Sequence, residues 1–385
     1  MTKQSIPTSC GRLPRLPNSP NRQRLNEVID QPLLNGMSSN SRGLVYNRSV
    51  NKRPTITDVA RLSGVTPATV SRVLNDRKKN FSTTEAVRTK IWDTARQLGY
   101  VPDLSARSLS LRNTRVIGLF ASPQTHVAEG INESLIEGIA ETLHAGGYDV
   151  FFGLSPVRST RNALPFWRFD GAILMQSPKP ETVAEMDLRR VPYVCVNERV
   201  GKPVASVLAD DAMGMTRAVS HLTQLGHKRI AYANARAAYF SHYSVNERYA
   251  TLLSAARDQT IRLIPGHDRP FHSPAEFIRS TVVEAGATAI ITYDHQIAVM
   301  VLGAAYGLGL RIPQDFSLVC FNDVFPVSIM YPTLTAVAVA GREMGRLGAD
   351  LLLNHLLPVQ PQSERIIRVP EDLIVRSSTA AVPTT

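Results

Sequence analysis

Seven short, almost wholly apolar segments between Val116 and Phe321 constrain the fold of this 385-residue chain more than any other feature. Stretches with helical spacing lie between most of them. Apolar runs without alternation are typical of strands buried on both faces of a parallel sheet. The segments are 116–120, 148–154, 171–175, 191–196, 229–233, 289–293 and 317–321. They predict a doubly wound α/β fold, and so many strands indicate two lobes rather than one sheet.

Residues 52–102 carry a different pattern, that of a compact helical module. Thr55 and Asp58 have the spacing of a capping box, in which each side chain bonds the backbone N–H of the other residue. The helix that they begin is expected to end just before Gly64. A glycine at that point supplies a turn that needs positive φ.

Two further helices complete the module. Thr66 is expected to cap the second helix, with Pro67 at its first position, where a missing N–H costs nothing. That helix is predicted to run to about Asn75. The third is predicted to begin near Thr83 or Thr84 and to end at Gly99.

The first two helices have the pattern of a helix-turn-helix. Ala60 is small enough for the helices to approach closely, Gly64 tolerates the turn, and Val70 would be buried against the first helix. Capped helix pairs of this kind also occur as purely structural hairpins. The pattern alone therefore leaves DNA binding open.

The net charge of +11 is concentrated at one end of the chain. Residues 1–50 hold seven Lys and Arg against two Asp and Glu, and residues 51–112 hold twelve against five. Residues 113–385 are nearly balanced, with 24 against 25. A positive excess confined to one end is the electrostatic footprint of a nucleic-acid-binding module, with a solvated basic surface as the alternative. Residues 1–51 are rich in Pro, Ser, Asn and Arg, which predicts a disordered basic extension.

The sequence argues against several other classes of protein. The chain has no run of about 18 apolar residues, so no transmembrane helix and no membrane partner are expected. The basic N-terminus is followed by no apolar stretch, so no secretory signal is expected. Cys10, Cys195 and Cys320 are too scattered for a disulfide framework or a metal site, and a reducing cytoplasm is the simplest context.

Motifs that carry enzymatic chemistry are missing from the sequence. It contains no HExxH, no Walker loop, no GxGxxG and no GxSxG. We therefore expect neither an enzyme nor a bound cofactor or metal, and we assign no catalytic residue.

Longer segments carry a resemblance to a known family. TITDVARLSGVTPATVSRVLN (55–75) closely resembles the headpiece of the lactose-repressor (LacI) family of bacterial regulators. LGYVPDLSARSL (98–109) resembles the linker and hinge helix of that family. The core continues the match in the family's order, for example with HLTQLGHKRIAY (221–232) and RIPQDFSLVCF (311–321).

The resemblance implies a domain order after the extension 1–51. A helix-turn-helix headpiece is expected at 52–102 and a hinge helix at 103–112. The remainder, 113–385, is expected to be a two-lobed core like the type I periplasmic sugar-binding proteins. The lobes are predicted as follows: the N-terminal lobe at about 115–208 and 336–358, and the C-terminal lobe at about 209–335 and 359–380.

In this family the second helix lies in the major groove of double-stranded DNA. The resemblance therefore implies base contacts by Pro67, Ala68 and Arg72, and Arg72 can donate two hydrogen bonds to guanine. Short polar side chains are expected to bind phosphate oxygens, which fix register without reading sequence. These are Thr55, Thr66, Thr69, Ser71 and Asn75.

The hinge is implied to bind the minor groove through Ala106, Arg107 and Leu109. Leu109 corresponds to an apolar wedge that enters between base pairs and kinks the DNA, whereas an ordinary packed leucine is the alternative. Asp103 departs from the family pattern, in which Asn or Ser is commoner. Its charge would weaken docking near phosphate, unless it caps the hinge helix.

The effector is implied to bind at Arg248, within NERYATL (246–252), although a surface ion-pairing arginine is the alternative. Tyr293 and Asn322 stand at two further effector positions, where the family usually has Asn and Asp. These changes remove one charge and add an aromatic platform. A neutral, stackable ligand such as a sugar fits them, although the segment between Leu154 and Phe169 is shorter than usual.

The expected function is that of a sequence-specific DNA-binding transcription regulator, of repressor type, controlled by a small-molecule effector. It would act in the cytoplasm, at the nucleoid, as a homodimer on a pseudo-palindromic operator. The alternatives are a sugar-binding transport protein and an effector-independent DNA-binding protein that uses its core only to dimerise.

Overall fold

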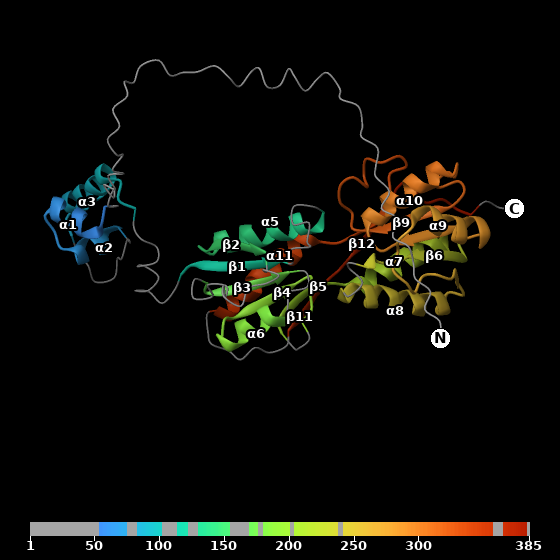
Figure 1. Cartoon of the computed structure of the whole chain (residues 1–385), viewed down its shortest axis with the longest axis horizontal. Helices are drawn as coiled ribbons and strands as arrows, with labels where there is room; N and C mark the ends of the chain where they lie inside the picture. Colours follow the sequence, from blue (N-terminus) through green and yellow to red (C-terminus); the bar gives the residue numbers. More distant parts are fainter. Residues whose placement is uncertain are drawn as a thin grey trace, which may run out of the picture. The chain divides into compact units, whose positions relative to one another are not determined.

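The computed structural model describes residues 54–74, 83–101, 114–121, 130–154, 169–175, 180–200, 204–237, 242–356 and 365–382. The chain divides into two compact units, Met1–Val101 and Pro102–Thr385. Among the described residues, the first unit contains the helices α1, α2 and α3, and the second contains two sheets flanked by helices (Figure 1). The predicted extension 1–51 and hinge helix 103–112 lie outside the described residues.

The headpiece consists of α1 (Ile56–Ser63), α2 (Pro67–Leu74) and α3 (Glu85–Leu98). The capping box between Thr55 and Asp58 is present, and Gly64 ends α1 with φ of 74°, as predicted. The three helices share a small apolar core, because each buries one face. It is formed by Val59, Ala60, Val70, Val73, Ile91 and Ala95.

The first sheet of the core has the strand order β11-β5-β4-β3-β1-β2, and all its pairs are parallel. Its strands are β1 (Val116–Ala121), β2 (Asp149–Leu154), β3 (Gly171–Met175), β4 (Tyr193–Val196), β5 (Ser206–Ala209) and β11 (Ile366–Val369). The helices of this lobe are α5 (Ile131–Ala145), α6 (Pro180–Leu188) and α11 (Gly341–Leu356). Ile173 and Met175 of β3 pack with α5 and α11, whereas Ala172 and Leu174 pack with α6. Burial on both faces explains why β3 is apolar throughout.

Helices α5 and α11 approach each other so closely that glycine is required where they meet. A Cβ on Gly138 would lie 2.0 Å from the carbonyl oxygen of Arg342. A Cβ on Gly345 would lie 2.2 Å from the carbonyl oxygen of Leu135. Backbone-to-backbone packing of this kind therefore sets the position of α11 in the N-terminal lobe.

The second sheet has the order β12-β10-β9-β8-β6-β7, with β12 alone antiparallel to its neighbour among the described pairs. Its strands are β6 (Arg229–Ala233), β7 (Arg262–Leu263), β8 (Ala289–Thr292), β9 (Ser317–Phe321), β10 (Thr335–Ala338) and β12 (Asp372–Ile374). Helices α7 (Asp211–Gln224), α8 (Tyr243–Asp258), α9 (Pro274–Ile278), η4 (Arg279–Glu284) and α10 (His295–Gly307) belong to this lobe. The two sheets confirm the predicted two-lobed α/β core.

The chain crosses between the lobes after β5, after β10 and between β11 and β12. These crossings correct the predicted lobe boundaries. The range 336–358 was assigned to the N-terminal lobe, but β10 pairs with β9 in the second sheet. The range 359–380 was assigned to the C-terminal lobe, but β11 pairs with β5 in the first sheet. Strands this short look alike in sequence, and only their pairing partners decide to which lobe they belong.

Candidate functional site

Helix α2 presents the residues predicted to contact bases on its exposed side. Pro67, Ala68 and Arg72 are exposed, whereas Val70 and Val73 are buried against the other two helices. The helical period separates these two sets. The exposed side of α2 is therefore open to a partner of the headpiece.

Threonine hydroxyl groups stand immediately before the first residues of α1 and α2. The Thr55 hydroxyl donates to Asp58 Oδ2 over 2.7 Å, and hydrogen bonds from Thr55 lower the pKa of Asp58. Thr66 Oγ1 accepts from the backbone N–H of Thr69 over 3.2 Å, and the two hydroxyls lie 3.0 Å apart. Thr55 and Thr66 are exposed, while Thr69 and Ser71 are partly buried. Three of the five predicted phosphate-binding side chains, Thr55, Thr66 and Thr69, thus lie at or near the N-terminal ends of these helices, and Ser71 lies in the middle of α2.

The other residues predicted to contact DNA lie outside the described part of the chain. They are Asn75 after α2 and the hinge residues Ala106, Arg107 and Leu109.

In the core, Arg248 of α8 lies inside a buried group of polar and aromatic side chains. Its Nε donates to Asp211 Oδ1 over 2.6 Å, and its Nη1 donates to the carbonyl oxygen of Tyr293 over 2.5 Å. The nearest oxygen of Glu371 is 3.9 Å from Nη2. The guanidinium carbon lies 3.9 Å from the ring centre of Phe321 and 4.9 Å from that of Tyr293. We call these five residues the Arg248 cluster.

The Arg248 cluster places two of the three predicted effector residues in direct contact. Arg248 and Tyr293 are both buried, at 5% and 8% exposure. Asn322 follows Phe321 at the end of β9 and is partly buried, with φ of 70°. Protein groups accept hydrogen bonds from Nε and Nη1, and the rings of Phe321 and Tyr293 lie close to the guanidinium. In this structure Arg248 is therefore neither an open arginine on the wall of a cleft nor part of an exposed surface ion pair.

Residues from both lobes meet beside this cluster, and the sequence had not pointed to them. His242 Nε2 donates to the carbonyl oxygen of Asn197 over 2.9 Å, and the Tyr243 hydroxyl donates to Asn197 Oδ1 over 3.1 Å. Because Nε2 must carry the proton, Nδ1 accepts from the Ser244 hydroxyl over 2.7 Å. Ser244 in turn accepts from the Tyr293 hydroxyl over 2.8 Å. A directed chain of hydrogen bonds thus links the end of β4 to the Arg248 cluster.

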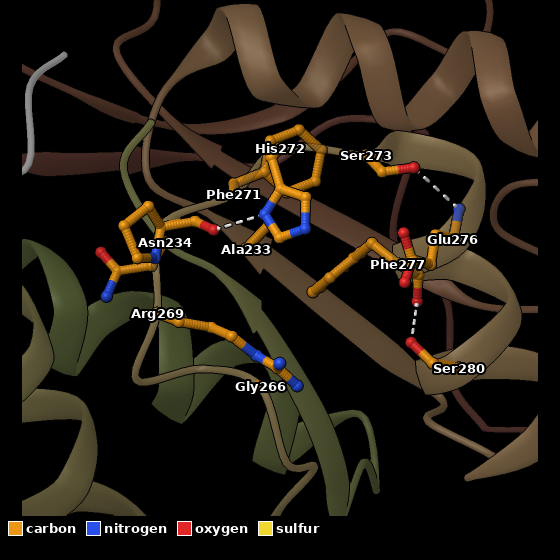
Figure 2. Close-up of a pocket in the computed structure, with 11 residues that line it drawn as sticks. Ala233, Asn234, Gly266, Arg269, Phe271, His272, Ser273, Glu276, Phe277 and Ser280 are labelled. Carbon is orange, nitrogen blue, oxygen red and sulfur yellow. Dashed lines mark hydrogen bonds between the residues drawn. The ribbon is translucent and has the colours of Figure 1, made fainter. Parts of the chain in front are cut away.

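A pocket of about 140 Å³ lies elsewhere in the C-terminal lobe (Figure 2). The end of β6, the segment 266–273 and the adjoining helix form its walls. Phe271 and Phe277 pack edge to face there, with ring centres 5.5 Å apart, and exposed Arg269 and Glu276 add opposite charges. No signal in the sequence had indicated this pocket, because its walls come from separate elements.

The described residues give no sign of a metal centre or a membrane span. No group of three His, Cys, Asp or Glu side chains among them could hold a metal ion. None of their helices has the length and apolarity needed to cross a membrane.

Family models match two parts of the chain. Residues 55–103 match the bacterial regulatory proteins of the lacI family, and residues 219–379 match a periplasmic binding protein-like domain. The probable HTH-type transcriptional repressor ExuR of Bacillus subtilis is 26% identical over 343 residues, which are 86% of this chain and 99% of that protein. The HTH-type transcriptional repressor PurR of Erwinia tasmaniensis is 28% identical over 345 residues, at 86% and 98% coverage.

Solved structures share the fold. The lac repressor dimer bound to operator and the anti-inducer ONPF has a TM-score of 0.72 at 23% identity, covering 86% of this chain and 100% of that one. The transcriptional regulator CelR in complex with cellobiose has a TM-score of 0.60 at 23% identity, covering 85% and 100%. The headpiece, the two-lobed core and the near full-length relatives agree. The chain joins a helix-turn-helix domain of the lacI family of bacterial regulatory proteins to a periplasmic binding protein-like core.

Proposed function

We propose that this protein is a sequence-specific DNA-binding transcription regulator, of repressor type, whose affinity for its operator is controlled by a small molecule. One observation carries the proposal: the helix-turn-helix has a capped first helix, and the exposed side of α2 presents Pro67, Ala68 and Arg72. The relatives over nearly the whole chain are named as transcriptional repressors. The basic excess of residues 1–112 favours a DNA partner as well.

On the operator, the side chains of α2 divide into two sets. Arg72 donates to guanine O6 and N7, and the apolar surfaces of Pro67 and Ala68 suit thymine methyl groups. Phosphate oxygens are bound by small hydroxyl and amide side chains, which set the register of the helix. These are Thr55, Thr66, Thr69, Ser71 and Asn75.

The minor-groove contacts belong to the hinge of a homodimer. Leu109, flanked by Ala106 and Arg107, is the proposed wedge. Two copies of the headpiece then read the two halves of a pseudo-palindromic site. The regulator would act on DNA in the cytoplasm.

The effector is proposed to bind beside Arg248, Tyr293 and Asn322. Tyr293 and Asn322 follow β8 and β9, and ligands of open α/β sheets bind at the carboxyl ends of strands. Asn197 of the other lobe accepts hydrogen bonds from His242 and Tyr243 beside these residues, so a ligand there would alter the contact between the lobes. CelR is described with cellobiose and an Enterococcus faecium relative with ribose, which supports a sugar.

Selection of bound DNA from a random pool tests the proposal. The full chain is expected to enrich one pseudo-palindromic motif, and addition of cellobiose, ribose or glucose is expected to change the enrichment. A transport protein or an enzyme would enrich no motif. A motif that none of these sugars affects would favour the alternative in which the core serves only for dimerisation.

A further inference from the structure

Glu371 lies on the connection between β11 of the first sheet and β12 of the second, where the chain crosses between the lobes. Its side chain is fully buried, and neither of its carboxyl oxygens has a hydrogen-bond partner among the described residues. Arg248 Nη2, at 3.9 Å from Oε1, is beyond hydrogen-bonding distance. A buried carboxyl group without partners needs a physical explanation.

The fold makes room for this carboxyl group. A Cβ on Gly214 of α7 would lie 1.9 Å from Glu371 Oε2 and 2.8 Å from Val337 Cγ1 of β10. The carboxyl group therefore packs directly against the backbone of α7. The side chain of Glu371 is consequently part of the packed core and has no exposed surface.

The charges around Glu371 favour its neutral form. Asp211 already takes the shortest ion pair of Arg248, so the cluster holds two carboxyl groups for one guanidinium. Burial raises the pKa of Glu371 to about 8, and the attraction of Arg248 offsets only part of that effect. The charged and titratable groups that interact with the carboxyl group are Asp210 and Asp211 at the start of α7, and Tyr243, Glu247 and Arg248 of α8. Around them, Arg217 donates to the backbone carbonyl oxygen of Glu371 and pairs with Asp372, and Arg368 pairs with Glu247.

We propose that Glu371 is a proton-binding site built into the crossing between the two lobes, and that its ionisation changes how the lobes are arranged. An ionised carboxylate must gain hydrogen bonds, either from Arg248 or from water. Because the carboxyl group packs against the backbone of α7, we expect either change to move the connection between β11 and β12 relative to α8. The proton thus acts as a ligand that favours the arrangement described here over one in which Glu371 is charged.

Infrared spectroscopy of the full chain tests the first half of the proposal. The wild type is expected to show the carbonyl band of a neutral carboxylic acid at about pH 6, and to lose it with a midpoint near pH 8. Glu371→Gln should lack this band. Asp372→Asn is the matched control, because Asp372 is the next residue, is exposed and pairs with Arg217. Absence of the band from the wild type, or its persistence in Glu371→Gln, would overturn the proposal; the wild-type titration decides even if the variant does not fold.

Distances between spin labels test the second half. Leu188 of α6 and Tyr306 of α10 are exposed, at 79% and 86%, and lie in different lobes. Each is replaced by cysteine in a Cys10→Ser background, since Cys195 and Cys320 are buried. The distance distribution is expected to differ between about pH 6 and about pH 9.5 in the wild type and to stay constant in Glu371→Gln. Equal distributions at both pH values in the wild type would refute the coupling. Both experiments omit DNA and effector, so failure here is separate from failure of the proposed function.

Discussion

Arg248 Nε donates to the Asp211 carboxylate over 2.6 Å, and both side chains are buried. Asp211 begins α7 just after the first crossing between the lobes, and Arg248 lies on α8. The pair thus ties the start of the C-terminal lobe to the helix that carries the proposed effector residue. Any role of Arg248 in ligand binding has to coexist with this structural role.

Replacing Arg248 by Met should lower the free energy of unfolding by about 3–5 kcal/mol, because it leaves buried carboxyl groups without their cation. Arg311→Met is the matched control. Arg311 is exposed and pairs with Asp315 at 3.4 Å, so its loss should change the free energy by about 1 kcal/mol or less. Urea unfolding of the two variants gives the comparison. Equal effects would show that the buried pair contributes no more than a surface pair.

Arg72→Ala should weaken binding to the selected operator by about 1–3 kcal/mol and relax the preference at one base position in each half-site. Arg96→Ala on α3 is the control, because Arg96 is also exposed but lies on another helix, where it pairs with Asp93. Binding is measured against a set of single-base operator variants at one salt concentration. Unchanged sequence preference in Arg72→Ala would contradict the assignment of α2 as the recognition helix.

Replacing either of two glycines, Gly345 and Gly303, by alanine should have opposite effects on the free energy of unfolding. Gly345→Ala puts a methyl group against the backbone of α5 and should cost about 1–3 kcal/mol of unfolding free energy. Gly303 lies within α10 with nothing within 4 Å of an added Cβ. Gly303→Ala should therefore stabilise the chain by up to about 1 kcal/mol through helix propensity. Thermal unfolding of both variants checks the signs; a neutral Gly345→Ala would mean that α5 and α11 can separate without cost.

The buried side chain of His227 should make the free energy of unfolding depend on pH. Its Nε2 atom lies 2.9 Å from Ser317 Oγ and 3.0 Å from the carbonyl oxygen of Ala380. Burial lowers the pKa of His227. The folded chain therefore binds this proton more weakly than the unfolded chain does. The unfolding free energy should fall as pH drops below the ordinary histidine value of about 6.5.

His227→Gln should flatten this part of the pH dependence of urea unfolding. His272→Gln, at an exposed position of the same lobe, should leave the slope unchanged. Burial also lowers the pKa of His221, so a smaller slope is expected to remain in His227→Gln. An unaltered slope would show that His227 does not contribute to it.

Some strands could be predicted from the sequence and others could not, and the difference has a physical reason. Segments such as 171–175 and 317–321 were predicted correctly, because strands buried on both faces are apolar at every position. The sequence did not reveal β5, β7, β10, β11 or β12, which are only two to four residues long. Such strands exist through their pairing partners, and a local pattern cannot show which sheet they join.

The same distinction holds for the functional residues. The capping box of Thr55 and Asp58, the turn at Gly64 and the exposed side of α2 were predictable, because each depends on residues within one or two helical turns. The sequence therefore determined by itself the headpiece and the side that it presents to a partner. Only the tertiary structure decided that Asp211, Arg248 and Glu371 meet in a buried site. These residues come from separate elements that the crossings between the lobes bring together, so their burial and the neutral form of Glu371 depend on contacts that no local pattern encodes.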